Sequence, residues 1–422
     1  MADPTGHRTA PGGLVPRVVA ATPAGRDRGL DALRALAILG VVLGHWLVTA
    51  LVADSGTLRT TSPLRALPEF VPLSWVFQTL AVFFLVGGYA GARGHARSMA
   101  AGETYRHWLG ARLARLARPV VPVVAVWAVV AVAMLAAGVD LDTVRALAKL
   151  VWSPLWFLLV FAALTAATPL AARLHPAWPL LTVALVDAAR FGLDAPAWLG
   201  WINVAAGWLV PYCLGAHLNR PHRGGPGDQG EPECRGGSGC QGGSGCQGGL
   251  GGPRTRRAAW GLLAGGVVAT AGLVLGAGYP AAMVGVPGAP VSNLDPPTLA
   301  AVTFGLAQSG AALLLLGPLR RLLRRPAAWA AVALANLAAM TIFLWHQTAM
   351  IAVTALGLVA ARPLPGLHTV PDGPGWVAAR LAWTPGFALA LLVCVAAFHA
   401  HERASGRSGS PVPGRDRVAP GG

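Results

Sequence analysis

Charged residues are scarce in this chain, and acidic ones are the scarcest. Only 12% of its 422 residues are charged, with 17 acidic residues against 33 basic ones, while 54% are hydrophobic. This composition excludes a soluble enzyme and leaves few residues for a large extramembrane domain. The net charge of +16 is explained by arginine in short loops beside a membrane, so we set nucleic acid aside as a partner.

Cysteine is also rare, with five residues in the chain. Cys213 and Cys394 lie within apolar runs, whereas Cys234, Cys240 and Cys246 recur every six residues in a glycine-rich repeat. Zinc sites usually space their cysteines more tightly, and no histidine is interleaved here. The sequence therefore predicts neither a disulfide framework nor a metal site, and the repeat is typical of a flexible linker.

Apolar runs near 20 residues long are abundant. We expect about ten membrane-spanning helices, at 33–52, 70–92, 120–137, 150–167, 179–193, 198–218, 258–277, 299–316, 337–358 and 381–399. An even number places both termini on one side of the membrane. Because arginine collects in every second connection, the positive-inside rule predicts cytoplasmic termini and a multi-pass protein of the cell membrane.

The expected fold is an all-α transmembrane helix bundle built by a single membrane domain at 29–400. Residues 1–28 and 401–422 have no run long enough to span, which predicts disordered cytoplasmic tails. Residues 219–257, which contain the glycine repeat, are expected to form a flexible cytoplasmic loop.

Two ionisable side chains stand out in the first span, Arg34 and His45. Their separation of eleven residues is about three helical turns, so both lie on one face, roughly 16 Å apart along the axis. We expect Arg34 at the headgroup level and His45 near the midplane. An ionisable residue at that depth is costly and is a functional-site hypothesis.

A second histidine is expected at the same depth. His346 lies about ten residues after Asn336, which would cap the helix that carries it, or roughly 15 Å deep. The two histidines could be hydrogen-bonded core residues, a proton relay, or the walls of one reaction chamber.

A basic stripe precedes the third span. Arg112, Arg115 and Arg118 recur every third residue just before Pro119, a spacing that fits either contact with anionic lipid or phosphate binding.

Several segments fall in a recognisable order. Besides Arg34-x10-His45, preceded by Asp31, these are VFFLVGGY at 82–89, RLARLARPVVP at 112–122, LWFL at 155–158, PYCLGA at 211–216 and TIFLWH at 341–346. Together they resemble the motifs of the integral-membrane acyltransferase 3 family of bacteria, over nearly everything from about residue 29 to 400. The chain departs from the family pattern in two places. Gly87-Gly88 replaces a Ser-Gly pair, and the three arginines offer two registers for an R-x-x-R motif.

The resemblance implies an O-acyltransferase that moves a short acyl group, commonly acetyl from acetyl-coenzyme A, to a hydroxyl of a carbohydrate or secondary metabolite. The donor is a co-substrate, and no tightly bound cofactor is implied. His45 would be the general base, since histidine with an ordinary pKa of about 6.5 is the usual one. Arg34 would hold the donor's phosphates with the stripe of Arg112, Arg115 and Arg118.

The remaining expectations concern the chamber between these residues. Tyr89, Trp156 and His346 are expected to form its walls. Gly40 and Gly44 are expected to leave room on the first helix for the donor's pantetheine arm. The rival hypothesis is a proton-coupled transporter or exporter of a lipid-linked sugar or small molecule, although the sequence shows no internal repeat of the kind that transporters often contain.

Overall fold

The computed structural model describes residues 13–23, 25–54, 57–218, 252–286, 289, 291–360 and 362–400. Its helices are α1 (Leu14–Ala20), α2 (Arg28–Val48), α3 (Pro63–Ala66), α4 (Val71–Phe77), α5 (Leu80–Ala100), α6 (Tyr105–Ala117), α7 (Val120–Ala136), α8 (Leu141–Trp152), α9 (Leu155–Ala166), α10 (Thr168–Ala171), α11 (Ala177–Asp187), α12 (Ile202–His217), α13 (Pro253–Gly276), α14 (Leu299–Leu322), α15 (Pro326–Leu337), α16 (Ala339–Leu358) and α17 (Pro374–Phe398). Strands β1 (Ala50–Asp54) and β2 (Thr57–Thr61) pair antiparallel, with Ala50 opposite Thr61. Short 3₁₀ or π segments lie at Pro68–Phe70, Ala188–Gly192 and Ala197–Trp201. The predicted all-α polytopic bundle is confirmed.

Nine helical segments of the described chain are long and apolar enough to cross a membrane. The span predicted at 179–193 is not among them. In its place the 11-residue α11 is continued by a five-residue π segment, Ala188–Gly192. At 1.5 Å per residue these elements reach about 24 Å, short of a hydrocarbon core about 30 Å thick. The first span also ends earlier than predicted, because the chain turns at Thr49 into the β hairpin.

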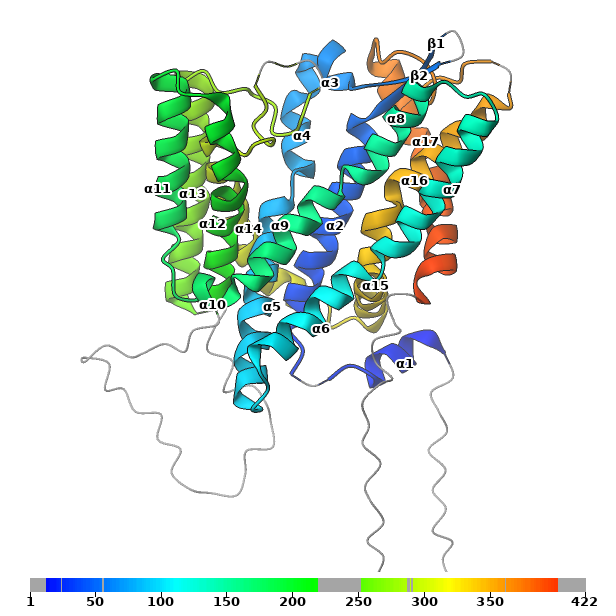
Figure 1. Cartoon of the computed structure of the whole chain (residues 1–422). Coiled ribbons are helices and arrows are strands. Elements are labelled where there is room, and N and C mark those ends of the chain that lie inside the picture. Colours follow the sequence, from blue (N-terminus) through cyan, green and yellow to red (C-terminus); the bar gives the residue numbers. More distant parts are fainter. Residues whose placement is uncertain are drawn as a thin grey trace, which may run out of the picture.

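Helix α2 lies at the centre of the bundle. It contacts α4, α5, α14, α15, α16 and α17. Helices α11 to α14 gather on one side of it, and α7, α8, α16 and α17 gather on the other (Figure 1). The main hydrophobic core extends along α2 through Ile38, Val42 and Trp46. The helix that carries Arg34 and His45 is therefore held on several sides.

Close packing of α5 against α12 depends on glycine. A Cβ atom on Gly88 would collide with the backbone carbonyl of Tyr212, and one on Gly215 would collide with the carbonyl of Leu85. The two backbones touch because neither residue has a side chain, as small residues allow in membrane helices.

We expect Gly88→Ala to destabilise the bundle by about 2 kcal/mol, since overpacking costs roughly 1–3 kcal/mol. Thermal unfolding of the purified protein in detergent measures the effect. Gly272→Ala on α13 is the matched control, because nothing lies within 4 Å of a Cβ atom there. An equal melting temperature for the two variants would contradict the account of this contact.

The domain begins earlier than residue 29. Within the segment predicted as a disordered tail, residues 14–20 form α1, whose Val18 and Val19 pack against a buried cluster that includes Trp329. The Trp329 indole also donates a hydrogen bond to the Thr22 hydroxyl at 2.8 Å. Val15 lies one turn before Val18 and Val19, and these three side chains give the segment a half-buried face that its composition did not reveal. Residues 1–12, 219–251 and 401–422, which include the glycine repeat, lie outside the described residues.

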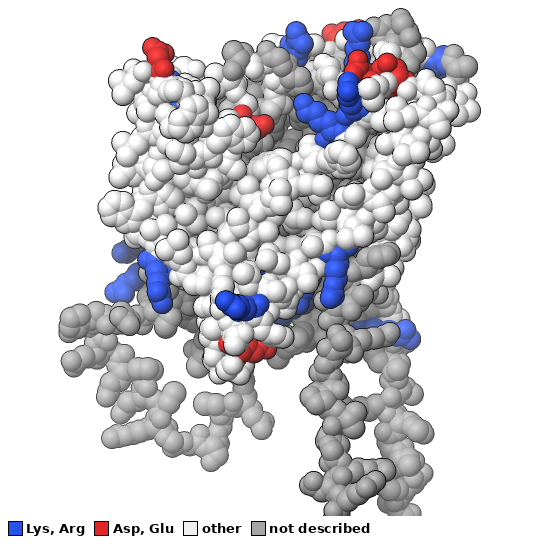
Figure 2. Space-filling view, in the orientation of Figure 1, with Lys and Arg blue, Asp and Glu red and all other residues white. Residues whose placement is uncertain are grey.

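Basic side chains gather at one end of the molecule. Arginines lie on α6, in the first turns of α13 and in the last turn of α14, at the end where α1 lies. Figure 2 shows a broad uncharged belt with Lys and Arg at both ends, and most of the acidic residues in view lie at the end away from α1 and α6. Helix α1 and the last turn of α17 lie at this same end (Figure 1). We call it the basic end.

Candidate active site

Both ends of α2 are fixed by buried or half-buried polar contacts. At the basic end the Asp27 carboxylate caps the helix by accepting from the Gly29 and Leu30 amides, and it pairs with Arg320 at 2.5 Å. At the other end the fully buried Arg380 of α17 donates to the carbonyl oxygens of Trp46 at 2.7 Å and Thr49 at 2.8 Å. These carbonyls belong to the last turn, where the helix dipole favours a cation.

The two predicted histidines meet between α2 and α16. The rings of His45 and His346 are 5.0 Å apart between centroids. The Trp46 indole donates to the backbone carbonyl of His346 at 2.9 Å, which ties the two helices together beside the pair. The predicted equal depth of the histidines is therefore confirmed. His45 lies three residues before the end of α2, farther from the basic end than the middle of this helix.

Hydrogen bonds orient both imidazole rings. His346 is fully buried, and its Nδ1 donates to the Phe343 carbonyl at 2.6 Å, while its Nε2 is buried without a partner among the described residues. The Gln347 amide lies 3.0 Å from His45 Nδ1. Sequence reasoning missed Gln347, although a glutamine beside a histidine inside an apolar helix was a signal that could have found it.

Three of the predicted arginines surround one cavity near the basic end. This cavity of about 130 Å³ is lined by Arg34, Phe83, Val86, Gly87, Ala90, Arg112, Arg115, Leu116, Phe161, Thr165 and Met340. Arg34 comes from α2, and the other two arginines come from α6. We call it the arginine cavity. Three guanidinium groups that converge from two helices can bind phosphate oxygens.

Not every predicted residue lines this cavity. Arg118 lies at the end of α6 and is exposed. The Tyr89 hydroxyl accepts from Arg93 at 2.9 Å. Trp156 is 37% exposed, and its ring lies beside Phe157 and Trp208. The structure therefore brings together Arg34, Arg112 and Arg115, and separately His45 and His346.

A row of aromatic side chains lies between the arginine cavity and the histidines. Phe83 and Phe161 line the cavity. Between ring centroids, Phe157 lies 5.1 Å from Phe83 and 5.3 Å from Phe343. The Phe343 ring centroid lies 6.1 Å from that of His346. This continuous row links the two clusters on the inner side of α5 and α9. Phe157, the neighbour of Trp156, is the residue that points inward.

The glycines of α2 do not leave the expected room. A Cβ atom on Gly40 would lie 2.6 Å from the Thr79 hydroxyl oxygen, and one on Gly44 would lie 3.0 Å from Phe77 Cβ. The helix is interrupted between α4 and α5 at Gln78 and Thr79. There the Thr79 hydroxyl donates to the Ala37 carbonyl at 2.7 Å. Phe77 and Thr79 occupy the groove beside the two glycines. The expected path for the pantetheine arm along these glycines is therefore wrong.

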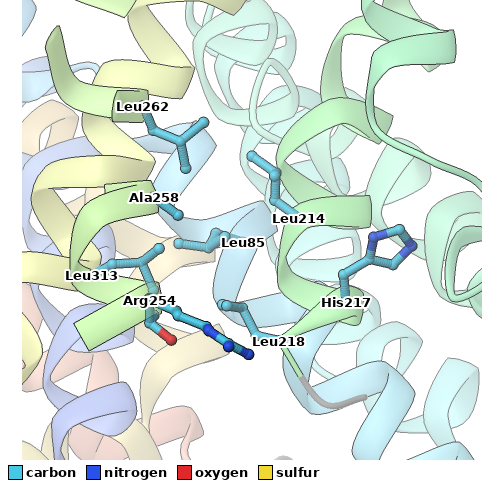
Figure 3. Close-up of a pocket in the computed structure, with 9 residues that line it drawn as sticks. Leu85, Leu214, His217, Leu218, Arg254, Ala258, Leu262 and Leu313 are labelled. Carbon is cyan, nitrogen blue, oxygen red and sulfur yellow. The ribbon is translucent and has the colours of Figure 1, made fainter. Parts of the chain in front are cut away.

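A larger cavity of about 310 Å³ lies elsewhere. Figure 3 shows leucines of α12 and α13 facing each other across it, with Arg254 at its edge. Its residues come from α5, α12, α13 and α14 and include none of α2, α6 or α16. We place the site at the arginine cavity and the histidine pair because polar groups able to perform chemistry converge there.

Other polar residues hold the bundle together. Asp187 is buried and accepts from the Asn203 amide, the Tyr279 hydroxyl and the Leu299 backbone amide. It thereby joins three helices at the end of the molecule away from the basic end. Among the described residues, no group of three or more His, Cys, Asp or Glu is placed to hold a metal ion.

Comparison with known proteins now bears on this geometry. A family model described as "Acyltransferase domain" (Acyl_transf_3) matches residues 27–399, nearly the whole chain. No curated protein and no solved structure matches the chain significantly. The match begins at Asp27, which caps α2, and ends at His399, the residue that follows α17. On this match the chain belongs to the acyltransferase 3 family and is an acyltransferase of the multi-pass membrane class.

Proposed function

We propose that this protein transfers an acyl group, acetyl in the first instance, from acyl-coenzyme A to a hydroxyl of a carbohydrate or secondary metabolite. The observation that supports this proposal is that two clusters lie along α2. The arginine cavity lies at the basic end, and the histidine pair lies beyond it. Arg34 and His45 lie roughly 16 Å apart along the helix axis. A donor with phosphates at one end and a thioester at the other matches this arrangement.

The donor enters from the cytoplasm in this proposal. The positive-inside rule assigns the basic end to the cytoplasmic face of the cell membrane, where acyl-coenzyme A is made. Arg34, Arg112 and Arg115 bind its phosphates, and guanidinium suits this role because its donors can grip two oxygens at once. The pantetheine arm then passes the aromatic row towards His45.

His45 acts as the general base. The acceptor hydroxyl gives its proton to the imidazole as its oxygen forms a bond to the thioester carbonyl carbon. The C–S bond then breaks, and the coenzyme A thiolate takes the proton back from His45. The products are the ester and free coenzyme A, so atoms and charge balance. His346, whose Nε2 is buried and has no partner among the described residues, accepts a hydrogen bond from a second hydroxyl of the acceptor and so orients the molecule.

Single substitutions in the arginine stripe test the donor site. We expect Arg112→Ala and Arg115→Ala each to raise the KM for acetyl-coenzyme A about tenfold, since one charge-assisted hydrogen bond contributes about 1.5 kcal/mol or more. Arg118→Ala is the matched control, because Arg118 shares the stripe but is not among the residues lining the cavity. An increase for Arg118→Ala as large as for the other two would remove the phosphate-binding role.

Arg34 can be tested by a charge-conserving change. We expect Arg34→Lys to keep the protein inserted but to raise the donor KM about tenfold, because lysine cannot make a bidentate contact with phosphate. Equilibrium binding of coenzyme A to the purified protein gives the same comparison without turnover. Unchanged donor affinity would make Arg34 a topology residue instead.

A further inference from the structure

A second polar group contacts the proposed base directly. Gln347 is fully buried on α16, and its amide nitrogen Nε2 donates to His45 Nδ1 at 3.0 Å. Its carbonyl oxygen Oε1 is also buried and has no hydrogen-bond partner among the described residues. An unpaired buried carbonyl is costly. Gln347 therefore makes one hydrogen bond to His45 through Nε2, and its Oε1 is a second group that could accept a hydrogen bond.

The direction of this hydrogen bond decides which nitrogen of His45 can act. A neutral imidazole carries one N–H, and the nitrogen that accepts from Gln347 cannot carry it. With Nε2 of Gln347 as donor, His45 holds its hydrogen on Nε2 and has no free lone pair to take a proton. A half-turn of the amide reverses this, because Oε1 then accepts from Nδ1–H and leaves His45 Nε2 bare.

We propose that Gln347 is a positioning residue for His45, whose amide carbonyl holds Nδ1–H and so presents Nε2 as the base. This inference rests on the proposed function. When Nε2 takes the acceptor's proton, both nitrogens of the imidazolium become donors. The Gln347 carbonyl then gives Nδ1–H its partner, as the third group does in nucleophile, base and orienter arrangements.

Gln347 takes the place that a carboxylate holds in many catalytic triads. The titratable ring in contact with His45 is His346, whose own Nδ1 is engaged by the Phe343 carbonyl. Arg380 lies beyond, on the carbonyls of Trp46 and Thr49. A neutral amide can alternate between donating to His45 and accepting from it, whereas a carboxylate can only accept.

Three variants test the inference in a thiol-release assay with acetyl-coenzyme A. We expect Gln347→Leu to lower kcat about 100-fold, within the range that base catalysis contributes, with the donor KM unchanged within about twofold. Gln347→Glu retains an acceptor for Nδ1–H, so it keeps most of the activity. Its pH–rate profile shifts by about one unit to higher pH, because a carboxylate favours the imidazolium. Gln308→Leu is the matched control, since the hydrogen bond that Gln308 donates goes to the backbone carbonyl of Gln78 and not to a histidine.

A spectroscopic measurement gives an answer that does not depend on turnover. The ¹⁵N chemical shifts of the His45 ring, assigned by their loss in His45→Ala, report which nitrogen carries the hydrogen. We expect these shifts to differ between the wild type and Gln347→Leu and to be unaffected by Gln308→Leu. Identical ring shifts in the wild type and Gln347→Leu would overturn the inference, as would a kcat for Gln347→Leu within threefold of the control.

Comparing Gln347→Leu with His45→Ala distinguishes failure of the role of Gln347 from failure of the proposed acyl transfer. If His45→Ala is inactive while Gln347→Leu turns over normally, His45 is the base and Gln347 does not position it. If His45→Ala itself turns over normally, the proposed mechanism fails and the role of Gln347 falls with it.

Discussion

Replacing His45 by alanine lowers acyl transfer about 1,000-fold or more while leaving the protein in the membrane. The expectation follows from position, because His45 and His346 meet on facing helices at the far end of the aromatic row from the arginine cavity. General-base catalysis contributes about 100- to 10,000-fold, and alanine leaves no group to take the acceptor's proton. Release of free thiol from acetyl-coenzyme A by matched amounts of purified protein measures the loss.

Two controls separate chemistry from folding. His175→Ala removes an exposed imidazole away from the site and is expected to leave the rate unchanged. Coenzyme A binding by His45→Ala is expected to equal that of the wild type, since the arginine cavity is untouched. A His45→Ala protein that retains more than a tenth of the wild-type rate would rule out His45 as the base.

Replacing Arg380 by leucine destabilises the protein by about 3 kcal/mol. Arg380 donates to the carbonyls of Trp46, Thr49 and Gly366 at 2.7 to 2.9 Å, and its guanidinium lies 4.7 Å from the centre of the Phe387 ring. Leucine leaves these carbonyls without a donor, and an unsatisfied buried polar group costs about 1–3 kcal/mol. The carbonyls of Trp46 and Thr49 lie at the C-terminal end of α2. Activity is therefore also expected to fall, because the turn that carries His45 loses its anchor.

Thermal unfolding in detergent measures this effect. Arg380→Lys is expected to lie between the wild type and the leucine variant, since an ammonium group keeps the charge but cannot reach all three carbonyls in the same geometry. Arg145→Leu, which removes an exposed arginine paired only with Asp142 at 3.4 Å, is expected to melt like the wild type. A melting temperature for Arg380→Leu equal to that of Arg145→Leu would show that the contacts to α2 carry no stability.

The parts of the fold that depend on helical period could be predicted from the sequence. The spacing of Arg34 and His45 placed both on α2, and the position of His346 in its helix placed it at the depth of His45, because the rise per residue is nearly constant in any helix. The apolar runs likewise predicted nine spans, although the tenth, at 179–193, is not among the helices long enough to cross a membrane. These features require no knowledge of which helices are neighbours.

Features that depend on neighbours could not be predicted. Trp156 and Phe157 differ by one position, or about 100° around the helix, and only packing decides that Phe157 faces inward. Gly40 looked like free space because the sequence does not show that Thr79 occupies the groove beside it. Arg380 lay just outside the predicted last span, since hydropathy reads an arginine as a loop residue even when carbonyl groups surround it.

The most direct test of the central claim asks whether a donor held at the arginine cavity reaches His45. Bromoacetyl-coenzyme A carries an alkylating carbon where the acetyl group would lie, and mass spectrometry of the labelled protein identifies the residue it modifies. The account predicts alkylation of His45, blocked by excess coenzyme A and weakened in Arg112→Ala but not in Arg118→Ala. Failure to modify His45, or modification of Cys213 or Cys394 that coenzyme A does not block, would contradict it.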